Sequence, residues 1–89
     1  MRISFSKKFS KQYNKAQPKI KSAFDKRLKL FMKNPLDPQL RNHELIGSYD
    51  GLFSINITGD WRVLYRKYKE NTETIVIFEM IGTHSQLYK

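Results

Sequence analysis

The chain has 89 residues, which is enough for one small domain and too little for two separate cores. It contains no cysteine, so disulfides and thiolate metal sites are excluded. A formal net charge of +9 favours polyanionic partners such as RNA, DNA or acidic protein segments.

Nothing in the sequence indicates export or membrane insertion. No apolar run approaches the roughly 20 residues needed to cross a bilayer. Met1-Arg2-Ile3 leads directly into regular patterns rather than into a signal peptide. We therefore expect a cytoplasmic protein with no membrane partner, folded as a single domain over residues 1–89.

The positive charge is concentrated in the first third of the chain. Residues 1–34 contain eleven Lys or Arg and one acid, Asp25, whereas residues 35–89 contain six Lys or Arg and seven acids. This basic third is the part that attracts an anionic partner. A Lys-rich helix face that is merely solvated is the alternative explanation.

The first half of the chain predicts a strand followed by two helices. Residues 2–5 alternate polar and apolar side chains, and Ser6 can cap the helix that follows. Pro18 suits the first turn of a second helix, which must end by residues 34–38 because two prolines there cannot continue it. Apolar residues recur at helical spacing in both helices: Phe9, Tyr13 and Ala16 in the first, and Ile20, Phe24, Leu28 and Phe31 in the second.

After a loop to about residue 44, the pattern changes to period two. Residues 53–58 and 61–66 alternate apolar and polar side chains around the turn residues Gly59 and Asp60, which predicts an antiparallel hairpin. Residues 74–80 predict a further strand. The expected fold is α+β, with an N-terminal strand and a two-helix hairpin packed on one face of a three- or four-stranded antiparallel sheet.

The other face of this sheet carries candidate functional residues. The alternation places Asn56, Arg62 and Arg66 there, and the tail after the last strand adds His84 and Tyr88. Guanidinium groups, an imidazole and an aromatic ring can hold phosphate and stack unpaired bases. An ordinary solvated sheet face is the alternative.

Cleavage of RNA at its 2′-hydroxyl needs a base for that hydroxyl, a cation for the phosphorane and an acid for the leaving 5′-oxygen. Histidine is the residue type whose ordinary pKa lies near neutrality, and the chain has two, His43 and His84. Asp60 adds a carboxylate and Arg62 a permanent cation. No metal-binding, P-loop or serine-triad pattern competes, so we expect neither a metal nor a cofactor. A lone histidine is more often a surface residue than a catalyst.

Three segments, NHELIG at 42–47, GLFSINITGDWRVLY at 51–65 and IGTHSQLY at 81–88, resemble the RelE/ParE toxin superfamily. The likeness is greatest to its RelE/StbE, YafQ-like branch and spans nearly the whole chain. The resemblance implies a microbial-RNase-like fold and a metal-independent endoribonuclease, an mRNA interferase that cuts messenger RNA on the ribosome and so inhibits translation. It also implies a cognate antitoxin, in a type II toxin-antitoxin system where a monomeric toxin joins a hetero-oligomeric complex.

The resemblance also implies roles for individual residues. YafQ-type sites match this sequence at His43, Asp60, Trp61, His84 and Tyr88, and RelE-type sites match it at Arg62. Two positions depart from the pattern, because Asn56 replaces a YafQ-type histidine and Met80 replaces an arginine of both branches. Either Arg62 or Arg66 must then supply the phosphorane-stabilising cation, or catalysis is weak. Beyond the catalytic set, Trp61, Arg66 and Asn56 are expected to bind RNA, and Lys7, Lys8 and Lys11 to dock on ribosomal RNA.

Two other functions remain open from the sequence. A ParE-like inhibitor would bind DNA gyrase and cleave nothing, but it needs no histidines, so His43 and His84 favour the nuclease. A catalytically weak member would only bind its antitoxin or the ribosome, and Asn56 and Met80 keep that alternative alive.

Overall fold

The computed structural model describes residues 1–88, and Lys89 lies outside them. The first half contains a strand, two helices and a short 3-10 helix: β1 (Arg2–Phe5), α1 (Lys7–Lys15), α2 (Pro18–Lys33) and η1 (Pro38–Leu40). The second half contains β2 (His43–Glu44), the 3-10 helix η2 (Gly47–Tyr49), β3 (Phe53–Asn56), β4 (Trp61–Glu70), β5 (Glu73–Thr83) and α3 (His84–Leu87). None of the helices described is long and apolar enough to span a bilayer.

The helical hairpin forms where the local signals predict it. The Ser6 hydroxyl accepts a hydrogen bond from the Phe9 N–H at 3.0 Å and so caps α1, and Pro18 occupies the first turn of α2. Of the predicted α2 stripe, Ile20, Phe24 and Phe31 are buried, while Leu28 is partly buried. The two helix predictions are confirmed.

The sheet has five strands in the order β1-β5-β4-β3-β2, which corrects the expected three or four antiparallel strands. β1 pairs with β5 in parallel, and the other neighbours pair in antiparallel fashion. The additional strand, β2, pairs only two residues with β3 and is too short to show alternation in the sequence. The sheet is therefore mixed.

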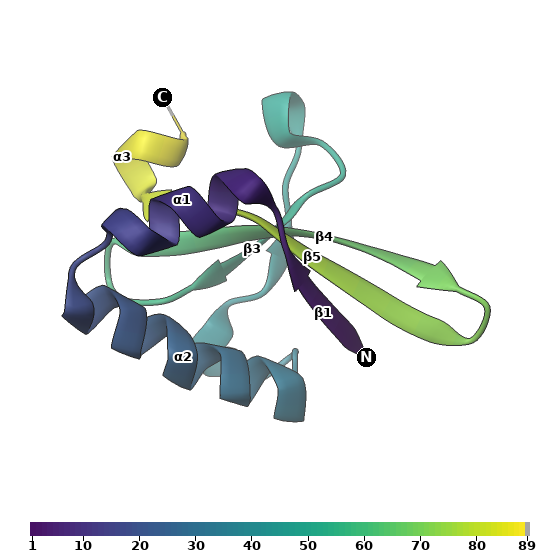
Figure 1. The fold of residues 1–89 in the computed structure, drawn as a ribbon. Coiled ribbons are helices and arrows are strands. Elements are labelled where there is room, and N and C mark those ends of the chain that lie inside the picture. The colour runs from purple at the N-terminus through teal and green to yellow at the C-terminus, as the bar shows by residue number, and fades with distance from the viewer. Residues whose placement is uncertain (89) are drawn as a thin grey trace.

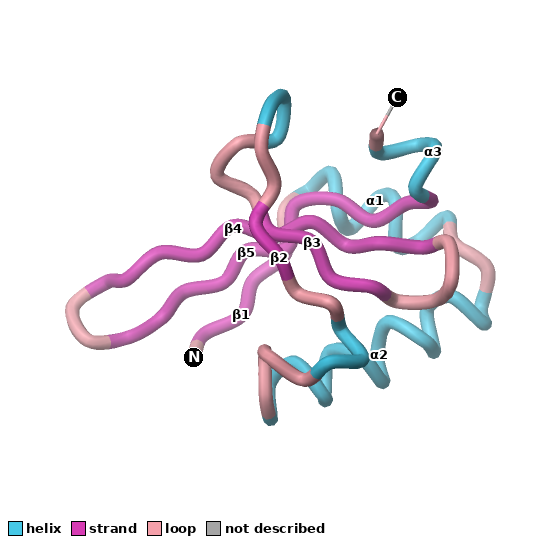
Figure 2. Tube along the Cα trace, turned by 180° about the vertical axis from the view of Figure 1, so that it is seen from behind, coloured by secondary structure: helices cyan, strands magenta, loops and turns pink. Residues whose placement is uncertain are grey.

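Helices α1 and α2 cover one face of the sheet, as the two opposite views show (Figures 1 and 2). The main core lies between these helices and the sheet, and it includes Phe9, Phe24, Ile55, Val63 and Phe78. The aromatic rings of Phe9, Phe24 and Phe78 contact one another there, with centroids 5.2 to 5.9 Å apart.

The second face of the sheet is not wholly polar, which corrects the sequence-based expectation. Leu64 is fully buried on it and packs with Leu52 and Leu87 in a second apolar cluster. Leu87 belongs to α3, a helix that the sequence pattern did not predict. The loop of residues 45–52 and α3 both extend beyond the same side of the sheet, at the top of Figures 1 and 2. Together they cover part of this face and leave the rest open.

Candidate active site

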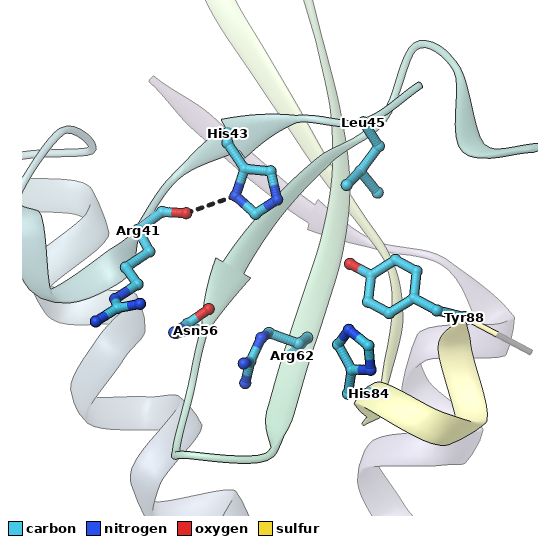
Figure 3. A pocket seen from close by; sticks show the side chains of 7 residues that line it. All are labelled: Arg41, His43, Leu45, Asn56, Arg62, His84 and Tyr88. Atoms are coloured by element: carbon cyan, nitrogen blue, oxygen red, sulfur yellow. Dashed lines mark hydrogen bonds between the residues drawn. The ribbon is translucent and has the colours of Figure 1, made fainter. Parts of the chain in front are cut away.

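The open part of this second face contains a pocket of about 510 Å³. Seven residues from four segments line it: Arg41, His43, Leu45, Asn56, Arg62, His84 and Tyr88 (Figure 3). Two of these residues are arginines, two are histidines and none is acidic. A concave site with this lining favours an anionic ligand.

His43 enters the pocket from β2, and its ring orientation is set by the residue two positions earlier. Nδ1 of His43 lies 2.8 Å from the carbonyl oxygen of Arg41. A carbonyl only accepts hydrogen bonds, so the proton of neutral His43 must reside on Nδ1. Nε2 then carries the free lone pair, which is the form a general base requires.

Arg62 faces the same pocket from the start of β4, directly across from Asn56 on β3. Its Nη1 donates hydrogen bonds to the carbonyl oxygens of Thr58, Gly59 and Trp61 at 3.1, 3.2 and 3.1 Å. These bonds fix the guanidinium against the hairpin turn and use only one of its nitrogens. Its Nε and Nη2 groups remain as donors for phosphate oxygens.

Helix α3 positions His84 at the edge of the pocket. Thr83 and Gln86 form a capping box at the start of the helix, and the His84 N–H donates to the Asp60 carbonyl at 2.9 Å. The His84 ring packs against Tyr88, with centroids 4.7 Å apart. The helix start is therefore tied to the β3–β4 turn that also holds Arg62.

Tyr88 and Tyr49 anchor the end of α3. The Tyr88 hydroxyl donates to the Oγ of Ser54, a fully buried residue of β3, at 3.2 Å. The Tyr49 hydroxyl donates to the Leu87 carbonyl, and its ring meets that of Tyr88 edge-on with centroids 6.0 Å apart. The loop of residues 45–52 thus fixes the helix that carries His84.

Besides the three predicted lysines of α1, three predicted site residues do not line this pocket. Trp61 lies on the opposite side of the sheet, where it packs against the main core. Arg66 is further along β4 and pairs with Glu79, with Nε and Oε2 3.3 Å apart. Asp60 is exposed in the turn, and its backbone carbonyl accepts a hydrogen bond from the His84 N–H.

The predicted rRNA-docking lysines lie on a separate surface. Lys7, Lys8 and Lys11 are exposed on α1, which covers the other face of the sheet (Figure 1). The pocket and this basic surface are therefore on opposite layers of the molecule.

Sequence analysis missed Arg41, Leu45 and Tyr49. Arg41 adopts a left-handed conformation, with φ 47° and ψ 45°, at the end of η1. No alternation extends into this loop, so the face on which its side chain falls could not be predicted. The closeness of Arg41 to His43 in sequence was the only available signal.

The arrangement can perform acid-base chemistry on a phosphate. It combines two imidazoles with two guanidiniums, and within residues 1–88 no group of three or more His, Asp or Glu side chains could hold a metal ion.

Several solved structures that share this fold are bacterial toxins. YafQ from E. coli strain BL21(DE3) matches with a TM-score of 0.81 and 26% identity over 100% of both chains. YafQ in the E. coli DinJ-YafQ toxin-antitoxin complex matches with a TM-score of 0.77 and 25% identity over 98% of this chain and 96% of that one. A YoeB/ParE toxin from Agrobacterium tumefaciens has a TM-score of 0.75 at 16% identity over 94% of this chain and 99% of that one, which shows the fold alone.

The fold and these matches define a toxin of the RelE-like superfamily, which confirms the resemblance seen in the sequence. The family model described as the bacterial toxin of type II toxin-antitoxin system, YafQ, matches residues 1–89, so the chain belongs to the YafQ family. A search of curated proteins returned no match.

Proposed function

We propose that this toxin is a metal-independent endoribonuclease that cleaves messenger RNA on the ribosome. The observation that carries the proposal is that His43, His84 and Arg62 face one another in the same pocket (Figure 3). None of the seven residues that line this pocket is acidic. Attack of an RNA 2′-hydroxyl on the adjacent phosphodiester requires general acid-base groups beside a fixed cation.

The geometry supports a role for each of these three residues. Nε2 of His43 takes the proton of the 2′-hydroxyl, and that oxygen attacks the adjacent phosphorus. The free guanidinium edge of Arg62 stabilises the charge that develops on the phosphorane oxygens. His84 donates a proton to the departing 5′-oxygen, so the products are a 2′,3′-cyclic phosphate and a 5′-hydroxyl. Tyr88 holds the His84 ring, and Asn56 lies beside the reacting phosphate.

The proposed partners are a cognate antitoxin, messenger RNA and ribosomal RNA. The E. coli DinJ-YafQ complex supports the antitoxin, because its toxin chain has this fold at 25% identity. The exposed lysines of α1 support docking on ribosomal RNA, since they form a basic surface separate from the pocket. We place the protein in the cytoplasm, where translating ribosomes are found.

The test is to express the chain alone in cells, map RNA 5′ ends and follow a DNA-damage reporter in the same culture. The nuclease predicts new RNA ends within coding sequences and a silent reporter. An active reporter with intact messages would instead identify a gyrase inhibitor. Growth arrest with neither signal would leave a toxin that only binds.

Replacement of His84 by alanine provides the internal control for that experiment. We expect cleavage to fall by about 100-fold or more, because a positioned proton donor contributes that much to such a step. The fold should persist, since the His84 side chain is exposed and the Asp60 contact uses its backbone N–H. Undiminished cleavage by a folded His84→Ala protein would remove His84 from the mechanism.

A further inference from the structure

The proposed cleavage reaction uses only one of the two guanidiniums in the pocket. Arg41 lines the end of the pocket near His43, and its side chain lies on the other side of Asn56 from Arg62 (Figure 3). We propose that Arg41 forms a second phosphate subsite, which binds the phosphodiester next to the scissile one in single-stranded RNA. This inference rests on the proposed function for the identity of its ligand.

The charges around Arg41 support an anion subsite. Within residues 1–88 the ion pairs are those of Arg2 with two glutamates and of Arg66 with one, all outside the pocket. Arg41 is exposed, and the pocket lining adds two histidines and a second arginine but no carboxylate. In the part of the chain that the structure describes, neither Arg41 nor Arg62 forms an ion pair, and one amide side chain lies between them, so two guanidiniums are available to two successive phosphates of one strand.

The backbone of Arg41 also contacts the proposed general base, His43. Its left-handed conformation is unfavourable for a residue other than Gly or Asn and directs the carbonyl oxygen to Nδ1 of His43. The residue that sets the tautomer of the proposed base therefore also carries the second cation. A strand held by Arg41 at one phosphate and by Arg62 at the next passes beneath the His43 ring.

The proposal predicts that the protein recognises two phosphates rather than one. The probes are a deoxydinucleotide with one phosphodiester and a deoxytrinucleotide with two, which lack the attacking hydroxyl and cannot be cleaved. At low salt the wild-type chain should bind the trinucleotide several-fold more tightly than the dinucleotide. The second phosphodiester can bind at Arg41 whether it lies on the 5′ or the 3′ side of the first. For a longer deoxyoligonucleotide, loss of one phosphate contact should reduce the slope of log K against log salt by about 0.7.

Two substitutions separate the side chain of Arg41 from its backbone. Arg41→Ala removes the guanidinium but keeps Cβ, so the cost of the left-handed conformation stays as it is in the wild type, whereas Arg41→Gly removes that cost as well and keeps the carbonyl that orients His43. Both should lose the gain from the added phosphate and show the smaller salt slope. Arg2→Ala removes one positive charge at the far edge of the sheet and is the matched control, with both quantities unchanged.

These binding measurements are independent of catalysis, so the two proposals can fail separately. If both Arg41 variants retain the gain and the slope, or Arg2→Ala loses as much as they do, the subsite is wrong even in an active nuclease. If the gain depends on Arg41 but the wild-type chain cuts no RNA, the subsite stands and the proposed reaction fails.

Discussion

At the scale of single residues, orientation comes mainly from backbone carbonyls. Arg62 is held by the carbonyls of Thr58, Gly59 and Trp61, and His43 by the carbonyl of Arg41. Such contacts do not depend on the identity of the side chains that surround the pocket. They fix one edge of each functional group and leave the other edge for a ligand.

Arg62→Lys tests whether the fixed, planar guanidinium is needed for cleavage. A lysine ammonium is a point charge that cannot bond the turn carbonyls and also present two parallel donors to a phosphate. We expect cleavage to fall by at least about tenfold while the protein stays folded, because one charge-assisted hydrogen bond contributes about 1.5 kcal/mol or more. Equal rates and equal RNA affinity for the lysine variant and the wild type would argue against a bidentate role.

A second residue-scale prediction concerns stability at alkaline pH. Tyr65 is almost fully buried, its hydroxyl donates to Oδ1 of Asn42 at 2.8 Å, and burial raises its pKa above the usual value. Since the folded-state pKa is the higher one, the stabilisation is complete below the unfolded-state pKa of about 10 and is lost as the pH rises through the folded-state pKa.

The free energy of unfolding, measured in urea from about pH 9 to about pH 11, should therefore decrease with pH. The free energy of unfolding of Tyr65→Phe should decrease less steeply than that of the wild type over the same range, although Oδ1 of Asn42 loses its donor at every pH. Lysine deprotonation affects both proteins alike and cancels in the comparison. Parallel curves for the two proteins would show that Tyr65 does not titrate differently on folding.

Period-two alternation explains which site residues could be predicted. It placed Asn56 and Arg62 on one face, and the pocket contains both. The same alternation puts Trp61 on the opposite face, where the structure has it. Arg41 could not be assigned a face, since it follows a 3-10 turn in a left-handed conformation. The contact of Tyr49 with α3 joins residues 38 positions apart, which no local pattern encodes.

At the scale of elements, predictability followed the strength of local signals. The helical hairpin has a capping serine, a proline in the first turn of α2 and apolar stripes, and its bounds agree with the sequence analysis. β2 and α3 contain two and four residues, respectively, so neither completes a period that sequence analysis could detect. Their stability comes from tertiary contacts, such as that of Leu87 with Leu52 and Leu64.

The separation of α1 from the pocket gives a prediction at this scale. Charge reversal of Lys7, Lys8 and Lys11 should weaken ribosome binding and flatten its salt dependence, because fewer counterions are released from the RNA. Cleavage of free RNA should be spared, since these side chains lie on the other layer. Ribosome pelleting and a free-RNA assay measure the two effects.

Lys69→Glu, near the end of the β4–β5 hairpin, is the control for charge change alone and should leave ribosome binding unaffected. Collapse of free-RNA cleavage with unchanged ribosome affinity would mean that the assignments of the two surfaces are reversed.

At the scale of the whole molecule, the sheet separates two surfaces by a single layer. One face carries the helical hairpin with most of the positive charge, and the other carries the pocket (Figures 1 and 2). An antitoxin segment can therefore silence the toxin in two distinct ways. It can fill the pocket, or it can occupy the helical hairpin and keep the toxin from the ribosome.

We expect the second way, because an acidic segment that is disordered when free gains most from the basic third of the chain. The complex should weaken as salt rises through about 0.1 to 1 M. A short deoxyoligonucleotide should bind the complex about as tightly as the free toxin, and the lysines of residues 7–33 should be protected from acetylation. An antitoxin that fills the pocket around Arg62 and His84 would produce the reverse pattern, with oligonucleotide binding lost and those lysines fully reactive.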